Sequence, residues 1–410
     1  MLMKRVVITG MAAITPLGDN WACVAEKLKS QTTGIQKMPD WSKYKGLNTQ
    51  LAAPTNFVRP EHYSRKQIRG MGRVAMLATY VTERALQDAG LLADPILKSG
   101  RVGIAYGSSS GSFDGLIDFT KMLLNCDKGS LDATSYIRMM GHTCPVNIGL
   151  HFGITGRIIP TSSACTSSSQ ALGYAYETIK HGIQTIMIAG GSDELSPSQP
   201  AIFDTLFATS QRNDEPHLTP RPFDKNRDGL VIGEGGASLI LEERDYALSR
   251  GAPIYAEVVG FGTNSDGLHI TKPDCQSMQT AMKLALQDAD LAAKAIGYVS
   301  AHGTATELGD IAESHATGAV FGHNIPISAM KSYTGHTLGA CGAIEAWAAI
   351  QMMNEGWFHP TANLDTIDPL CAELDYITAA TRLLECEYLM SNNFAFGGIN
   401  TSLIFKRCLS

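Results

Sequence analysis

The stretch Ala85-Leu-Gln-Asp-Ala-Gly-Leu91 recurs in the second half of the chain as Ala285-Leu-Gln-Asp-Ala-Asp-Leu291. Each copy closes an amphipathic segment whose apolar residues recur at helical spacing. Each is followed by a short apolar run that is typical of a strand, Arg101–Gly107 in the first case and Ile296–His302 in the second. The same order of helix and strand in both places predicts an internal duplication.

Two further segments extend the repeat upstream. Lys4–Gly10 and Ile254–Gly260 are strand-like runs that end in glycine, and each precedes one copy of the helix. Strands that alternate with helices favour an α/β architecture with mainly parallel sheets. We therefore expect two similar α/β halves, 1–251 and 252–410, with the boundary near Arg250–Pro253.

The composition limits the classes of function. The chain has 410 residues, 44% of them apolar, so it can bury a large core and is too long for one ordinary domain. Its net charge of −6 gives no basic footprint for nucleic acid. No stretch approaches the roughly 20 apolar residues that a membrane-spanning helix needs.

The cysteines and the start of the chain indicate a compartment. There are nine cysteines, an odd number, and none forms a Cys-x-x-Cys pair. This usage indicates free thiols in a reducing environment and argues against a zinc site. The first residues lead directly into a strand-like run, with no apolar segment and cleavage site of a secretory signal. We expect a cytoplasmic protein.

The most reactive candidate is Cys165, in the run Thr161-Ser-Ser-Ala-Cys-Thr-Ser-Ser-Ser169. The residues that follow, Gln170–Lys180, have helical periodicity, so the thiol is predicted at a helix N-terminus. There the free N–H groups and the helix dipole favour thiolate, the nucleophilic form. The alternative is a small buried cysteine in a capped helix. A weaker similarity links this helix with the one after Cys341.

Two histidines and a lysine lie in glycine-punctuated segments further along. His302 follows an apolar run in Ile296–Thr306, and His336 follows Lys331 in the segment Lys331-Ser-Tyr-Thr-Gly-His336. Each segment has the form of a strand that ends in a polar turn. Taken alone, either histidine could be structural. Together with Cys165 they form a nucleophile with two proton or hydrogen-bond partners.

These residues resemble a known family, the elongating β-ketoacyl-acyl-carrier-protein synthases of the thiolase superfamily. The resemblance covers essentially the whole chain. Its most specific pieces, in chain order, are Ala164-Cys-Thr-Ser167, Arg221-Pro-Phe-Asp-Lys-Asn-Arg-Asp-Gly229, Ala301-His-Gly-Thr-Ala-Thr306, Lys331-Ser-Tyr-Thr-Gly-His336 and Phe396-Gly-Gly398.

The resemblance implies a thiolase-like fold, in which duplicated α/β halves form five layers (αβαβα) and the active site lies where the halves meet. The segment Ser108–Ile159, which we expect to be an irregular insert, would build dimer contacts and the acyl pocket. The segment Gln36–Arg59 is expected on the surface.

The resemblance also implies a decarboxylative Claisen condensation. Cys165 would accept an acyl chain from carrier protein, and the backbone N–H groups of Cys165 and Phe396 would form its oxyanion hole. His302 and His336 would stabilise the enolate made from malonyl thioester. Lys331 would set the electrostatics around the histidines, with Glu313 as its carboxylate partner.

Further residues of the site follow from the same likeness. Thr304 and Thr306 match hydroxyls that hold the phosphopantetheine arm, and Phe396 matches the residue that gates the acyl pocket. The predicted substrate-binding residues also include Ser110, Phe203 and Phe394. No metal, nicotinamide or other cofactor is implied, because the phosphopantetheine arrives on the carrier protein.

Cysteine with two histidines separates the elongating synthases from two relatives. In the family, Cys-His-Asn marks initiating synthases and Cys-His-Cys marks thiolases that act on coenzyme A esters. Two alternatives stay open: a coenzyme A thiolase, and a subunit that sets chain length beside a ketosynthase but lacks the nucleophile. Homodimer and heterodimer are both compatible with the sequence.

A carrier protein is strongly acidic, so the resemblance implies a basic docking patch. Lys66 and Arg69, in Ser64–Arg69, match basic residues that face the carrier in the family. The family often has another arginine where this chain has Phe207, so docking is expected to differ in detail.

Several departures point toward ketosynthases of aryl-polyene or related type II polyketide clusters, with ordinary fatty acid elongation as the alternative. Ser110 stands where housekeeping enzymes usually carry a bulkier aliphatic residue. Ala395 and Ile399 replace the usual Gly and Thr of the gating loop, and should stiffen it. Asp193-Glu194 after Gly191 is the last such feature.

Overall fold

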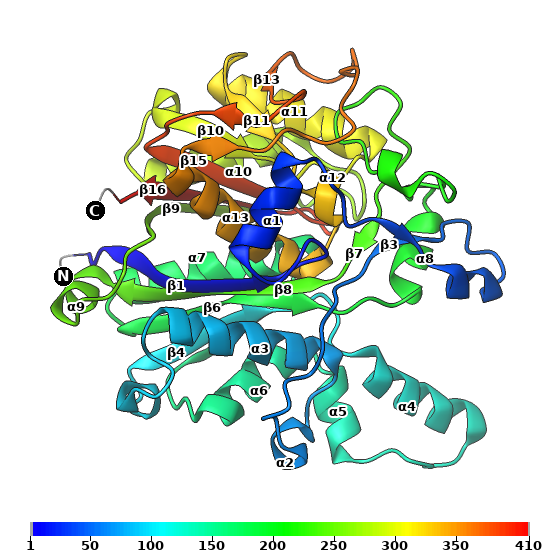
Figure 1. Ribbon diagram of the computed structural model, residues 1–410, viewed down its shortest axis with the longest axis vertical. Helices are drawn as coiled ribbons and strands as arrows, with labels where there is room; N and C mark the ends of the chain where they lie inside the picture. Colours follow the sequence, from blue (N-terminus) through cyan, green and yellow to red (C-terminus); the bar gives the residue numbers. More distant parts are fainter. Residues whose placement is uncertain (1–2, 409–410) are drawn as a thin grey trace.

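The computed structural model describes residues 3–408, and Figure 1 shows two similar halves stacked on one another. The chain passes from the first half to the second through α9 (Arg244–Ser249) and the loop that follows it. The α/β class is confirmed.

The first half contributes five strands to the central sheet, in the order β5-β4-β6-β8-β1. β1 pairs antiparallel with β8 and β8 antiparallel with β6, whereas β6, β4 and β5 run parallel. Its main elements are β1 (Val6–Ile14), α3 (Arg73–Asp88), β4 (Val102–Gly107), β5 (Ile158–Thr161), α7 (Ser167–Lys180), β6 (Ile186–Asp193) and β8 (Gly235–Glu243).

The second half repeats this arrangement. β9 pairs antiparallel with β16 and β16 antiparallel with β15, whereas β15, β10 and β11 run parallel. The duplication is therefore confirmed at the level of topology. The elements are β9 (Ala256–Ser265), α10 (Cys275–Asp288), β10 (Ile296–Ser300), α11 (Glu307–Phe321), β11 (Pro326–Ser328), α12 (Lys331–Thr334), α13 (Cys341–Glu355), β13 (Asp375–Tyr376), β15 (Tyr388–Phe394) and β16 (Ile399–Arg407).

The repeated helix packs on its strand in the same way in both halves. A Cβ added to Gly10 on β1 would lie under 3.0 Å from the carbonyl oxygen of Ala85 on α3. A Cβ added to Gly260 on β9 would meet the carbonyl oxygen of Ala285 on α10 equally closely. The glycine that ends each strand-like run is thus needed because a helix backbone touches it.

The aspartate of the repeat also makes the same contact in both halves. Asp88 accepts a hydrogen bond from the backbone N–H of Met11 at 2.9 Å, and Asp288 accepts one from Phe261 at 3.1 Å. Each acceptor therefore ties the end of a helix to the residue after the packed glycine. The repeated sequence is a helix-to-strand clamp.

The elements form the expected five layers (Figure 1). From bottom to top these are α3 with α6 (Thr143–Phe152), the strands of the first half, α7 with α13, the strands of the second half, and α10 with α11. The two sets of strands meet where Val6–Ile8 of β1 pairs with Ala256–Val258 of β9, so hydrogen bonding continues through eleven strands.

The middle layer explains why two helices are buried on most of their surface. α13 is covered on both sides by strands, and its residues from Cys341 to Ile350 are all buried. α7 is buried at ten of its fourteen positions. A helix that is buried all round belongs in the interior.

The insert Ser108–Ile159 differs from the irregular segment that we expected. It folds into α4 (Phe113–Asn125), α5 (Ala133–Met139) and α6, and the first two project from the body at the lower right of Figure 1. Asp132 caps α5 through the backbone N–H groups of Thr134 and Ser135. Two of the glycines that suggested a loop lie at close contacts instead, since a Cβ on Gly111 or Gly115 would strike the backbone of α5.

The segment Gln36–Arg59 is only partly a surface segment. Its strand β3 (Leu51–Ala53) is fully buried and joins β2 and β7 in a small sheet. Within residues 3–408, no helix is long and apolar enough to cross a membrane. The remaining elements are α1 (Trp21–Lys29), β2 (Gln36–Lys37), α2 (Arg65–Ile68), α8 (Ser198–Asp204), β7 (Ile232–Gly233), β12 (Trp357–Phe358) and β14 (Arg382–Leu383).

Candidate active site

Cys165 lies at the N-terminal end of α7, on a turn that follows β5. One turn of 3-10 helix, Ala164–Thr166, joins the two elements, and Ala164 has a positive φ of 51°. A non-glycine residue in this region is uncommon and costly, and such positions cluster at functional sites. The turn brings the sulfur to the contact between the halves, where Cys165 is 5% exposed.

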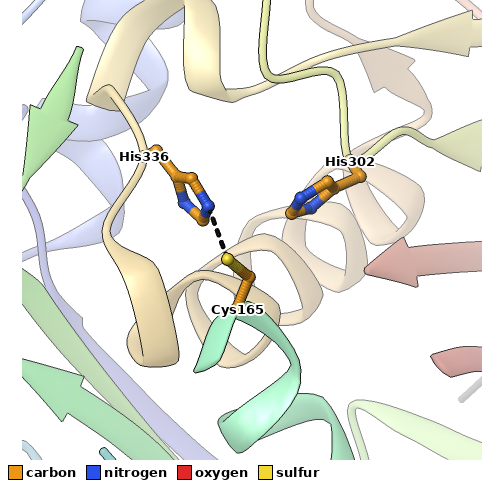
Figure 2. Close-up of side chains that lie close together, drawn as sticks. All are labelled: Cys165, His302 and His336. Carbon is orange, nitrogen blue, oxygen red and sulfur yellow. Dashed lines mark hydrogen bonds between the residues drawn. The ribbon is translucent and has the colours of Figure 1, made fainter. Parts of the chain in front are cut away.

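His336 approaches the sulfur from the second half. Its backbone is held by β7, because its N–H donates to the carbonyl of Val231 at 2.7 Å and its carbonyl accepts from Gly233 at 2.9 Å. Its Nε2 lies 2.9 Å from the Sγ of Cys165 (Figure 2). Its Nδ1 accepts the backbone N–H of Leu338 at 3.2 Å. The neutral ring must then carry its proton on Nε2, facing the sulfur.

His302 lies beyond the end of β10 and faces the same sulfur (Figure 2). The Nζ of Lys331 lies 3.1 Å from its Nδ1 and, as an ammonium, donates to it. This ring therefore also carries its proton on Nε2. The His302 and His336 ring centres are 5.3 Å apart and their planes are nearly perpendicular. Two ring N–H groups converge above one thiol.

Both imidazoles are neutral. Burial lowers the pKa of His302 and of His336 well below 6.5, and the positive charge of Lys331 lowers both further. A buried imidazolium beside an ammonium is disfavoured. The pair can therefore donate hydrogen bonds at neutral pH without taking up protons.

The Cys165 thiol does not ionise as easily as its place at a helix N-terminus led us to expect. Burial raises its pKa to about 11, although Lys331 and the backbone N–H groups of Phe396 and Cys165 act to lower it. Loss of hydration outweighs the helix end here. The helix end thus acts in the expected direction but is outweighed by burial, and both N–H groups predicted for the oxyanion hole are among the groups that lower the pKa of the thiol.

A cavity of about 410 Å³ leads to the triad. Its walls come from α8, the loop between β9 and α10, the start of α11 and the loop between β15 and β16. The predicted site residues that line it are Cys165, Phe203, His302, Thr304, Thr306, Glu313, His336, Phe394 and Phe396.

Comparison with known proteins identifies the family. The description "Beta-ketoacyl synthase, N-terminal domain" matches residues 3–247, and "Beta-ketoacyl synthase, C-terminal domain" matches residues 255–365. The chain belongs to the β-ketoacyl synthase family.

Individual relatives agree over the full length. The 3-oxoacyl-[acyl-carrier-protein] synthase 1 of Haemophilus influenzae is 36% identical over 99% of both chains. A crystal structure of a β-ketoacyl synthase from Burkholderia phymatum is 56% identical, with a TM-score of 0.98 over 99% of this chain and 100% of that one. The ishigamide ketosynthase/chain length factor is 28% identical, with a TM-score of 0.90 over 99% and 100%. The thiolase-like fold and a condensing acyltransferase are thereby confirmed.

Lys331 of the synthase pairs with a carboxylate that sequence reasoning missed. Its Nζ lies 2.5 Å from Glu345 on α13, and the other oxygen of Glu345 accepts from the side chain of Asn393 at 2.7 Å. Burial acts to lower the pKa of Lys331, but Cys341 and Glu345 outweigh it and raise that pKa. The ammonium is therefore kept. The residues around Glu345 gave little indication of this role, because they form an otherwise apolar helix.

Glu313 is not the ion-pair partner that we expected for Lys331. Its two oxygens accept the backbone N–H groups of His302 and Gly303, each at 2.7 Å. Burial raises its pKa to about 8 against these two donors. Glu313 therefore shapes the loop that carries His302, and Glu345 neutralises the lysine.

Three other predicted positions lie away from the channel. Ser110 is exposed in the loop after β4, and Lys66 and Arg69 are exposed on and just after α2. None of them lines the cavity that leads to Cys165. By contrast, the hydroxyls of Thr304 and Thr306 lie in its wall, 2.8 Å from one another.

The triad is also the one group in the described chain whose ligand atoms could hold a metal ion, since its three atoms lie within 4.8 Å of one another. Its surroundings do not suit this use. A histidine that ligates through Nε2 donates its Nδ1–H to a partner. Here, both Nδ1 atoms receive donors, from Lys331 and from the Leu338 backbone. The arrangement is built for hydrogen-bond donation toward the cavity.

Proposed function

We propose that this synthase condenses an acyl chain held on Cys165 with malonyl-carrier protein, giving β-ketoacyl-carrier protein and CO2. One observation carries the proposal. A buried thiol faces two neutral imidazoles, and the hydrogen-bond partners of both rings leave an Nε2–H directed into the channel.

The first step transfers the acyl chain. The sulfur of Cys165 attacks the carrier thioester, the carbonyl oxygen becomes an oxyanion, and the N–H groups of Cys165 and Phe396 receive it. One such donor is typically worth about 3 kcal/mol. Collapse of the tetrahedral intermediate breaks the C–S bond to the carrier, and the proton of Cys165 leaves on the carrier thiol. No charge remains on the protein.

The second step makes the carbanion. The thioester carbonyl of malonyl-carrier protein accepts hydrogen bonds from the Nε2–H groups of His302 and His336. Loss of CO2 places the electron pair on an enolate that both donors stabilise. The enolate carbon attacks the acyl-Cys165 thioester, the C–S bond breaks, and the thiolate of Cys165 is regenerated and protonated by water.

The other residues of the channel suit a thioester that arrives on the phosphopantetheine arm of a carrier protein. The paired hydroxyls of Thr304 and Thr306 would bind the phosphopantetheine. Phe396, whose ring centre is 5.1 Å from that of Phe203, would gate the acyl pocket. Phe394 lies beside His302, at 6.1 Å between ring centres. The reaction needs no metal, nicotinamide or other cofactor, and we place it in the cytoplasm.

A dimer is part of the proposal. β5 ends the sheet as an edge strand, and Ile158 on it is 41% exposed. On α4, Leu123 and Leu124 are at least 70% exposed. Apolar side chains gathered on a protruding element mark an interaction surface. A second copy or a chain-length-factor-like subunit would cover it, and the pathway would be aryl-polyene or polyketide elongation, with fatty acid elongation as the alternative.

The test separates this proposal from its rivals. Cys165 of the wild-type protein should be labelled by acyl-carrier protein and by a cerulenin-like inhibitor, and Cys165→Ala should not. His302→Ala and His336→Ala should abolish malonyl decarboxylation, while His359→Gln, at another buried histidine, should retain it. Unlabelled wild type would favour the non-catalytic subunit. Cleavage of acetoacetyl-coenzyme A without carrier protein would favour a thiolase.

Mass spectrometry of the products settles the substrate class. Malonyl-carrier protein is offered with saturated, polyunsaturated and aryl acyl carriers. Preference for the unsaturated or aryl chains supports the polyene pathway. Condensation only after a second subunit is added would establish a heterodimer.

A further inference from the structure

The mouth of the channel is ringed by exposed apolar side chains. Four residues that line the cavity also rank among the exposed large apolar residues: Leu206 and Phe207 after α8, Ile270 in the loop before α10, and Leu308 at the start of α11. We call these four residues the apolar rim. They come from three separate segments, so their convergence is a property of the fold and not of one sequence run.

Phe207 is the most exposed member, at 84%, and its backbone is also strained. Its φ is 55°, in the turn three residues beyond the end of α8. The N–H groups of Phe207 and Ala208 close the helix by donating to the carbonyls of Asp204 and Phe203, each at 3.0 Å. Glycine or asparagine is the usual residue in such a cap. A bulky aromatic there buries nothing and costs free energy, so its presence is not explained by stability.

The charged residues around the mouth do not form the basic patch expected for an acidic partner. Asp228, Asp266 and Glu307 line the cavity, against Arg227 and Lys272. Arg227 is 3% exposed at its side chain and is paired with acidic residues of the protein. Asp228 in turn lies 3.6 Å from the guanidinium of Arg212. Asp266 and Glu307 therefore face one exposed ammonium, that of Lys272. The helix α2, which carries Lys66 and is followed by Arg69, lies well below α8 in Figure 1.

We propose that the apolar rim, centred on Phe207, is the surface on which the acyl carrier protein docks, and that apolar contact rather than ion pairing dominates this docking. The inference rests on the proposed function, because the protein that delivers a thioester to Cys165 must cover the mouth of its channel. An acidic face laid against these carboxylates would be repelled, whereas an apolar face of the carrier would bury the rim. Phe207 then determines which carriers are accepted.

The experiment compares one acyl and malonyl pair delivered in two ways: on the carrier protein whose malonyl form the wild-type enzyme condenses, and as small pantetheine thioesters. Phe207→Asn keeps the helix cap, since asparagine tolerates a positive φ. It should raise the KM for the carrier-bound substrate by about tenfold or more. The KM and kcat for the small thioesters should not change, and Tm should not fall.

Leu383→Asn is the matched control, because Leu383 on β14 is 86% exposed and does not line the channel. It should leave the KM for the carrier unchanged. Raising the ionic strength from about 0.1 M to about 1 M shortens the screening length from about 10 Å to about 3 Å. Wild type should change its KM for the carrier by less than about twofold, whereas Phe207→Arg should become salt-dependent.

Three results would overturn the inference. The KM for the carrier could stay unchanged in Phe207→Asn, it could rise equally for the small thioesters, or the variant could change the oligomeric state, which would make the rim a subunit interface. The affinity of Cys165→Ala for the carrier, with and without Phe207→Asn, is measured directly. This binding measurement tests docking even if neither kind of substrate is condensed. Failure of condensation would contradict the proposed function and not this inference.

Discussion

The turn at Cys165 in the first half and the turn at Leu338 in the second are two versions of one structure with different uses. In both, one turn of 3-10 helix, Ala164–Thr166 or Leu338–Ala340, precedes a middle-layer helix. In both, its first residue has a positive φ, 51° at Ala164 and 50° at Leu338. The residue that follows is the nucleophile in the first case and Gly339 in the second.

Gly339 shows why only one turn carries a nucleophile. A Cβ there would lie 2.7 Å from an oxygen of Asp193, and that oxygen already accepts the N–H of Gly339. The second turn is therefore packed against the first half, and its role is to hold His336 two residues upstream of Leu338. Duplication supplied two equal turns, and close packing left space for a reactive side chain at one.

The largest expected effect comes from replacing, one at a time, the two buried cysteines that lie close to these turns. Cys165→Ala removes the nucleophile and should lower condensation by about 10⁴-fold or more. Cys341→Ala, at a neighbouring buried thiol whose Sγ donates to the carbonyl of Cys165 at 3.2 Å, should lower it by less than about tenfold. The measurement is transfer of an acyl group to protein, followed by mass spectrometry. Similar losses in both variants would mean that the sulfur atoms act together.

The next-largest effect comes from the buried Lys331–Glu345 ion pair, which lies in the second half beside the site. Lys331→Met leaves Glu345 unpaired, which should cost about 3–5 kcal/mol of stability. It also frees Nδ1 of His302, so the Nε2–H donor is no longer fixed and decarboxylation should fall by about 100-fold. Denaturant unfolding and CO2 release measure the two effects.

The double variant Lys331→Met/Glu345→Gln separates them. It should regain most of the stability, because no buried charge is left unpaired, and none of the decarboxylation. Recovery of both would show that the lysine acts through folding alone.

A third comparison tests whether the repeated clamp is equally important in each half. Gly10→Ala and Gly260→Ala both force a methyl group against a helix carbonyl, and each should destabilise the protein by about 1–3 kcal/mol. Chemical denaturation measures the loss. Gly46→Ala is a control, since no atom lies within 4 Å of its added Cβ, although its φ of 83° adds strain. Equal losses at Gly10 and Gly260 would confirm equivalent packing, and a loss confined to one half would refute it.

The smallest effect is that of pH on stability. The buried histidines of the described chain, His302, His336 and His359, all lie in the second half. Burial lowers all three pKa values below 6.5, that of His359 to about 4. At these three positions the unfolded chain therefore binds more protons than the folded one below pH 6.5, and their contribution to stability should fall as pH decreases from there, by up to about 1.4 kcal/mol per pH unit for each histidine. Burial raises the pKa of Glu313 to about 8 and of Asp193 to about 7, and these two carboxyls act in the opposite direction.

Hydrogen exchange gives the sharper form of this prediction. Between pH 6.5 and pH 4, amides around His359 should lose less protection in His359→Gln than in the wild type, because the variant has no imidazole to protonate there. Equal losses in the two proteins would show that His359 does not contribute to the pH dependence.

Particular residues show how far the sequence alone could lead. The repeat around Ala85 and Ala285 predicted the duplicated fold, because close helix-to-strand packing leaves a readable trace of small residues. Cys165, His302 and His336 were found because they occur together, each within a motif that resembles the family. Glu345 was missed, since nothing local distinguishes a carboxylate that pairs across the core from one that faces water.

Other differences have physical causes that only coordinates reveal. The ionisation of Cys165 depends on how much water surrounds it, and burial proved stronger than the helix end. The glycines between Ser108 and Ile159 indicated a loop, whereas the structure places Gly115 where α4 touches α5. The strain at Phe207 requires a backbone angle, which no residue pattern supplies.

The Lys331–Glu345 pair leaves the resting site with no net charge, because the thiol and both imidazoles are neutral. A malonyl group brings one negative charge, CO2 carries none away, and the charge ends on the sulfur of Cys165. Each catalytic cycle must therefore admit one proton from solvent to a nearly dry centre. Proton supply through the open channel, rather than carbon–carbon bond formation, would then set how fast the enzyme recovers at alkaline pH.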